Sequence, residues 1–121
     1  MTDTPILPEG DATPEEIPEP QTVEVGQMWR DNDQRTKGSG EFTVVAVVGS
    51  RHGDATYLPG HPRPDLVSKA VKRTVLSPAI KDSAFPFAIV NRDGRLTRVN
   101  CDRLLKGTNT QRGYTYLGMS R

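Results

Sequence analysis

The sequence predicts an all-β protein, a small five-stranded barrel with a long insertion and an acidic, proline-rich N-terminal tail. Phe42 to Val48 (FTVVAVV) is rich in β-branched residues and too short for a typical helix, which predicts a buried central strand. Hydrophobic residues make up only 34% of the 121 residues, which favours a small core. Asp93-Gly94 stands between two apolar runs, a pattern typical of a tight β-hairpin.

The first strand is expected to begin near Val23. Val23 and Val25 alternate with polar residues on the way to Met28 or Trp29, and this period of two is typical of a half-buried strand. Gly26 interrupts the alternation and predicts a bulge or a bend. The next residues, Asp31-Asn32-Asp33, favour a turn, and Gln34 to Gly40 (QRTKGSG) predicts the hairpin connection to the central strand.

Residues 49–83 are predicted to form an insertion after the central strand. Within it, Ala55 to Leu58 favours a short strand. Asp65 to Leu76 (DLVSKAVKRTVL) fits two alternatives. One is a helix capped by Asp65, with one face formed by Val67, Ala70, Val71 and Thr74. The other is a strand from about residue 71 to 76. The helix is favoured over the first half of the segment.

The rest of the chain supplies the strands that complete the barrel. Phe85, Phe87 and Ile89 alternate along a third strand, and Asp93-Gly94 turns the chain back. The return strand is expected over Leu96 to Cys101, with inward side chains Thr97, Val99 and Cys101 and outward side chains Leu96, Arg98 and Asn100. A single helical turn is expected over Cys101 to Leu105. The closing strand contains Tyr114, Tyr116 and Leu117, so the barrel domain is expected over residues 22–118.

Residues 1–21 are predicted to form a disordered tail. They contain five prolines and few apolar residues, a composition that supports neither a helix nor a sheet. Residues 1–24 carry seven carboxylates and no Lys or Arg, whereas residues 25–121 carry 16 basic and eight acidic side chains. The tail could lie over the basic body and screen it from nucleic acid. Alternatively, Ile6 and Leu7 could anchor it as an arm on a partner protein.

Two parts of the sequence resemble known proteins. Val25-Gly26-Gln27-Met28-Trp29, followed by Lys37-Gly38-Ser39-Gly40 and the apolar strand, resembles the opening of small SH3-like barrels, including the KOW-type loop-and-strand unit. VGQMWRDND, TRVNCDRLL and GYTYL are similar to segments of short uncharacterised proteins of actinobacteria and their phages. This similarity covers roughly residues 22–48 and 84–118.

The resemblance implies an SH3-like barrel of bacterial or phage origin. Through the KOW unit it also implies association with RNA or ribosomes, although the group of uncharacterised proteins has no assigned activity to transfer. The sequence departs from the KOW pattern at Gln27, where an acidic residue is usual, and from the uncharacterised proteins by residues 49–83.

Basic residues in three segments are the candidate nucleic-acid-binding residues, because Arg and Lys bind phosphate oxygens and Arg also stacks on bases. They are Arg92, Arg95 and Arg98 on the hairpin, Arg103, Lys106 and Arg112 after it, and Lys69, Lys72 and Arg73 in the insertion. Three aromatic residues could either stack on bases or fill the core: Trp29, Tyr114 and Tyr116.

The sequence offers no set of residues for catalysis, a metal or a cofactor. His52 and His61 with Cys101 lack the spacing of a zinc site, and no nucleophile–base set or phosphate-binding glycine loop is present. No secretion signal or membrane-spanning run is found, and the lone cysteine favours a reducing compartment. We therefore expect a non-enzymatic protein in the cytoplasm of a bacterial host or in a virion.

Two functions remain open at this point. The first is a nucleic-acid-binding barrel that uses its basic hairpin and is moderated by the acidic tail. The second is a protein-interaction or virion-associated structural module, with a protein partner or a homo-oligomer, that uses the tail as an arm.

Overall fold

The central strand of the protein is β3 (Glu41–Val48), where the sequence predicts it. It belongs to a six-stranded antiparallel sheet in the computed structural model, which describes residues 19–32, 40–52, 54–108, 110 and 113–120. The other strands are β2 (Gln27–Asp31), β4 (Ala55–Tyr57), β5 (Phe87–Arg92), β6 (Arg95–Asn100) and β7 (Tyr114–Met119). The helices are α1 (Pro64–Leu76), the 3₁₀ turn η1 (Asp82–Ala84) and α2 (Cys101–Lys106).

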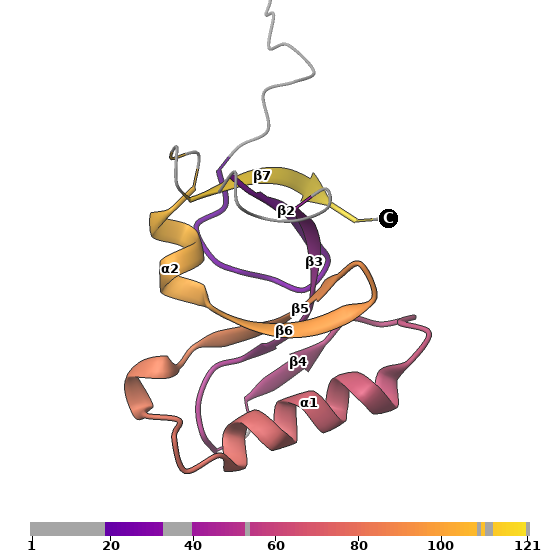
Figure 1. The fold of residues 1–121 in the computed structure, drawn as a ribbon, viewed down its shortest axis with the longest axis vertical. Helices are drawn as coiled ribbons and strands as arrows, with labels where there is room; N and C mark the ends of the chain where they lie inside the picture. The colour runs from indigo at the N-terminus through magenta and orange to yellow at the C-terminus, as the bar shows by residue number, and fades with distance from the viewer. Residues whose placement is uncertain (1–18, 33–39, 53, 109, 111–112, 121) are drawn as a thin grey trace, which may run out of the picture.

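The strands follow the order β6-β5-β3-β2-β7, and β4 pairs with the second half of β3. The last strand, β7, therefore pairs with the first, β2, as a barrel requires. However, β6 and β7 are the two ends of this order, and no ladder joins them among the described residues. Figure 1 shows α2 at the side of the molecule where the chain passes from β6 to β7. The protein is mostly β, as predicted, but the sheet has six strands rather than five, because β4 adds to β3, and no hydrogen bonds between described residues close it.

A β-bulge at Val45 allows β3 to contribute to two cores. The pairing of β3 with β5 runs from Val44↔Val90 directly to Ala46↔Ile89, which leaves Val45 as the extra residue. An extra residue shifts the alternation of side chains by one position. Phe42 and Val44 therefore lie in one core, while Val45, Ala46 and Val48 lie in the other.

Each core has its own cover. The first core is built around Trp29 and Leu104, both 0% exposed, and it is covered by β2, β7 and α2. The second core is covered by α1, whose Val67, Ala70 and Val71 pack against Phe87 and Ile89 of β5. Figure 1 shows α1 on the opposite side of β5 and β6 from α2 and β7. Residues 49–83 thus supply the helix that covers the second core.

The alternative of a strand from about residue 71 to 76 is wrong, because α1 continues as a helix to Leu76. Its buried residues are spaced three and four apart, so helical periodicity places them on the second core. Asp65 does not cap the helix. The N-cap is Arg63, Pro64 begins the helix, and Asp65 lies in the first turn, where a hydrogen bond from Arg63 lowers the pKa of its carboxyl.

The predicted hairpin turn and the predicted bend at Gly26 are confirmed, but the bend lies in a turn before β2, which begins at Gln27 rather than near Val23. Gly26 has a φ of +91°, its N–H donates to the Val44 carbonyl at 2.8 Å, and the register of β2 with β7 shifts between Met28 and Trp29. Asp93 and Gly94 have φ angles of +53° and +84°, the two consecutive positive values of a type I′ turn. These backbone positions decide where β2 curls and where β5 reverses.

The return strand differs from its prediction in two respects. β6 ends at Asn100, because Cys101 begins α2 and the Asn100 side-chain oxygen accepts a hydrogen bond from the Arg103 N–H at 3.0 Å. Leu96, predicted to face outward, packs against the second core, because α1 covers that face of the sheet. The predicted inward position of Val99, against the first core, is confirmed.

Of the predicted tail, the structure describes only residues 19–21. Residues 1–18, including the proposed arm residues Ile6 and Leu7, lie outside the described residues. The same is true of residues 33–39 in the predicted hairpin connection. Among the helices that the structure describes, none is long and apolar enough to cross a membrane.

The packing of α1 predicts that its buried face is essential for stability. Val67 is 2% exposed, so Val67→Ala removes two buried methyl groups and should lower the free energy of unfolding by about 2 kcal/mol. Urea denaturation measures this change. The matched control is Lys72→Ala on the exposed face of the same helix, expected to change stability by less than about 0.5 kcal/mol. Equal effects of the two changes would contradict the role of α1 as a core element.

The buried thiol of Cys101 predicts a loss of stability at high pH. Burial, together with the Asp102 carboxylate, raises the pKa of this thiol from 9.0 to about 11. Between these values the unfolded chain loses its thiol proton before the folded chain does, so the free energy of unfolding falls as pH rises. In Cys101→Ala the fall from pH 9 to about 11 should be smaller by about 2 kcal/mol. Urea denaturation at several pH values tests this, and parallel pH curves would refute it.

Candidate functional site

A cleft of about 500 Å³ lies between the end of α1, the segment that follows it and β6. Three of its lining side chains are cations that come from three separate parts of the chain: Arg73, Lys81 and Arg98. Three others carry hydroxyl groups: Thr74, Ser77 and Ser83. The remaining lining residues are Ala79, Ile80 and Ala84, so no carboxylate of the described residues lines the cleft.

Regular secondary structure positions two of the three cations. Arg73 lies in the last turn of α1, on the flank of the helix rather than on the buried face that contains Val67, Ala70 and Val71. Arg98 is two residues after Leu96 on β6, and residues two apart share a face of a strand. Leu96 enters the core under α1, so Arg98 extends from the same face at the edge of the helix.

Arg51 organises the segment that carries the third cation, Lys81. Its guanidinium donates to the Ile80 carbonyl at 2.7 Å, to the Val75 carbonyl at 3.3 Å and to the Asp82 carboxylate at 3.3 Å. It also lies over the Phe85 ring, 5.5 Å from the centroid. These contacts join the end of α1 to η1. The sequence analysis missed Arg51, since nothing in its local sequence indicates partners about 30 residues away.

The cations of the cleft have no internal counter-charge in the part of the chain that the structure describes. None of Arg73, Lys81 and Arg98 forms an ion pair there. The nearby carboxylate of Asp82 pairs instead with Arg51, and its side chain is 94% exposed. Three neighbouring positive charges without an internal anion create a positive local potential. The cleft therefore favours an anionic ligand, and its hydroxyl groups add hydrogen-bond donors for anionic oxygens.

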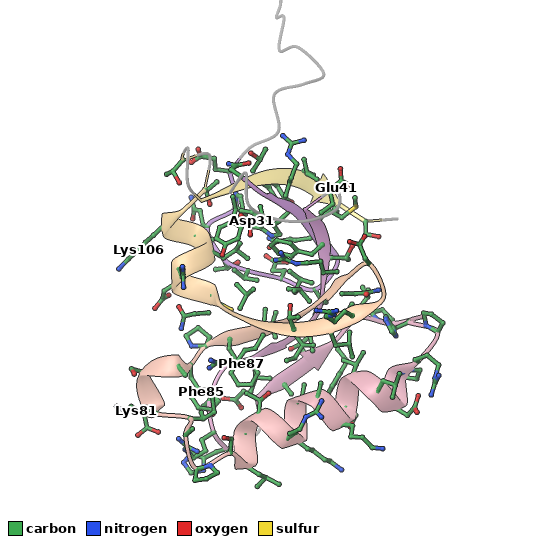
Figure 2. All side chains as sticks on the ribbon, in the orientation of Figure 1. Asp31, Glu41, Lys81, Phe85, Phe87 and Lys106 are labelled. Carbon is green, nitrogen blue, oxygen red and sulfur yellow. The ribbon has the colours of Figure 1, made fainter. Side chains whose placement is uncertain are left out.

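The other predicted basic residues lie away from the cleft. Lys69 and Lys72 lie on other parts of α1, and Arg95 is at the exposed tip of the β5–β6 hairpin, on the strand face opposite to Arg98. Arg103 and Lys106 are exposed on α2, and Figure 2 shows Lys106 well separated from Lys81. Arg112 lies outside the described residues. The structure thus brings together Arg73 and Arg98, but not the whole basic hairpin.

Arg92 is held inside the protein rather than on a binding surface. Its guanidinium pairs with the Asp31 carboxylate at 3.6 Å and lies over the Phe42 ring, 4.9 Å from the centroid. Its side chain is only 25% exposed. These contacts join the end of β5 to β2 and β3 above the first core, which accounts for Arg92 without an external ligand.

The aromatic candidates belong to the first core. Trp29 is fully buried, and its indole N–H donates to the Gln27 side-chain oxygen at 3.3 Å, so it cannot stack on a base. Tyr116 packs against Trp29 with ring centroids 5.0 Å apart, and Tyr114 forms a T-shaped contact with Phe42, with ring centroids 5.9 Å apart. Burial, with the nearby Glu24 carboxylate, raises the pKa of Tyr116. Of the two alternatives in the sequence analysis, the core role is confirmed for Trp29.

Comparison with protein-family models, with curated proteins and with solved structures found no match to this chain. Within the described residues, no group of three or more His, Cys, Asp or Glu side chains is placed to hold a metal ion.

The contacts of Arg51 predict that it holds the cleft in shape. Arg51→Ala removes the hydrogen bonds to Val75, Ile80 and Asp82 and should lower the free energy of unfolding by about 1 to 3 kcal/mol. Hydrogen exchange of the amides in residues 77–84 should accelerate. The control is Arg63→Ala, which breaks an exposed ion pair with Asp65 and should change both readouts little. Unchanged exchange in Arg51→Ala would exclude this role.

Proposed function

We propose that this chain is a non-enzymatic nucleic-acid-binding module that holds a phosphate backbone in the cleft formed by Arg73, Lys81 and Arg98. The observation that carries the proposal is the convergence of three cations, without a lining carboxylate, from a helix, a loop and a strand. Guanidinium groups bind phosphate oxygens in a fork, and lysine adds a point charge. A cleft open to solvent can accept a polymer that continues beyond it at both ends.

We also propose that the fold is an SH3-like barrel of the kind expected in small proteins of actinobacteria and their phages. The pairing of β7 with β2 and the short helix α2 before the last strand support this arrangement. The resemblance of the β2–β3 region to KOW-type units makes RNA the first nucleic acid to test.

The acidic residues of the tail are proposed to moderate binding. Residues 1–24 carry seven carboxylates, and the rest of the chain has an excess of eight positive charges. Attraction between them would compete with nucleic acid for the cationic surface.

Salt dependence tests the proposed site directly. Binding of short labelled RNA and DNA, single- and double-stranded, is measured by fluorescence anisotropy at about 50 and 200 mM salt. If the three cations neutralise three phosphates, counterion release predicts a fall in affinity of roughly 20-fold for single strands and 40-fold for duplexes. Arg73→Gln and Arg98→Gln should each weaken binding and reduce the slope of log affinity against log salt by about 0.7 to 0.9.

Control variants separate this cleft from the other basic residues. Lys106→Gln removes an exposed charge on α2 and should leave the slope nearly unchanged. Arg95→Gln tests the hairpin tip in the same way. Full-length chain in which Glu15 and Glu16 are changed to Gln should bind more tightly if the tail competes. Absence of binding at low salt, or equal losses in all four Gln variants of the body, would refute the assignment of the cleft.

A further inference from the structure

A second hollow, of about 280 Å³, lies on the other flank of α1, between the first half of that helix and β4. Its walls are mainly apolar, and its polar groups come from Tyr57, His61 and Ser68. Tyr57 is 43% exposed, which is high for a large aromatic side chain beside a core. The ring of His61 is fixed, because its Nδ1 accepts a hydrogen bond from the Arg63 N–H at 3.0 Å. This hollow shares no lining residue with the cationic cleft.

β4 is an edge strand beside this hollow. It pairs only with β3 among the described elements. The Leu58 N–H donates to the Val45 carbonyl, and the Asp54 carbonyl accepts from the Gly49 N–H. In an antiparallel ladder such pairs alternate along the strand, so Asp54, Thr56 and Leu58 turn their backbone groups towards β3. Ala55 and Tyr57 therefore direct their N–H and C=O groups away from the sheet, where no described residue pairs with them.

The side chains of Ala55 and Tyr57 on β4 lie on the same face of the sheet as the hollow. Ala55 packs against the core beneath α1, and Tyr57, two residues later, lines the hollow on that face. A strand added beside β4 would place the residue opposite Tyr57 on the same face as Tyr57, because directly opposed residues share a face. If the added strand runs antiparallel to β4, that residue would form both of its backbone hydrogen bonds with Tyr57 and direct its side chain towards the hollow.

We propose that β4 and this hollow form a docking groove for an extended peptide of a partner protein, which adds to the sheet beside Ala55 and Tyr57 and inserts one aliphatic side chain against α1. The unpaired backbone groups select an extended polypeptide, since these alternating donors and acceptors match another strand. The apolar walls formed by Val45, Leu58 and Val67 select an aliphatic residue. This inference does not depend on the proposed nucleic-acid site.

Selection from a displayed library of random peptides, with the full chain as bait, tests the groove. We expect enriched peptides to share one aliphatic position. Ser68→Phe fills the hollow and should weaken their binding about tenfold or more. Lys69→Phe places the same side chain about 100° further around the helix and should leave their affinity nearly unchanged. Nucleic-acid binding should be unchanged in Ser68→Phe, which alters no charge, and this separates the test from that of the cleft.

Methylation of the peptide backbone tests strand addition without altering the protein. N-methylation of the residues that pair with Ala55 and Tyr57 should weaken binding about tenfold, whereas methylation of the intervening residues should have little effect. Failure to enrich any peptide, or enriched peptides whose affinity survives Ser68→Phe, would overturn the proposal. If N-methylation weakens binding equally at successive peptide residues, the peptide does not bind by adding a strand to β4. If the full chain self-associates and Ser68→Phe abolishes that association, the occupant of the groove is a second copy of this chain. That result would refute a separate partner protein.

Discussion

The central strand β3 is buried on both faces, and the rest of the structure depends on covering two apolar surfaces at once. The bulge at Val45 makes this possible, because it directs Val44 to one core and both Val45 and Ala46 to the other. β5 alternates between the same two cores with Ala88 and Ile89. A sheet of this kind would expose one apolar face if either cover were absent. The segment 49–83 is therefore part of the folding unit.

The two candidate binding features arise from the way in which α1 covers the second core. A single helix shields a strip of the sheet and leaves a hollow along each flank. Arg73, on one flank, faces Arg98 and Lys81, whereas Ser68, on the other, faces apolar side chains and Tyr57. Residues five apart on a helix point about 140° away from each other, so the same element borders sites of opposite chemistry. One hollow is lined by cations and hydroxyl groups, and the other has mainly apolar walls.

Three arginines show why counting charges in a sequence is not enough to locate a site. Arg51 donates hydrogen bonds to backbone carbonyls and pairs with Asp82. Arg92 pairs with Asp31 and lies over the Phe42 ring. Arg98 has no ion-pair partner among the described residues. The sequence analysis gave Arg92 and Arg98 the same role. Their difference depends on residues far away in the chain, so local sequence contains no signal for it.

Local sequence determined the positions of β3, the Asp93-Gly94 turn, the bend at Gly26 and the short helix α2, because backbone preferences and short-range side-chain patterns act over a few residues. It left α1 ambiguous, since its last six residues suit a strand as well as a helix. The tertiary structure decided that case by packing Val67, Ala70 and Val71 onto the sheet. The tertiary structure also turned Leu96 inward and buried Trp29 completely. It placed Arg73 and Arg98 in the lining of the same cleft. Each of these outcomes depends on which elements face each other, a property of the whole chain rather than of any segment.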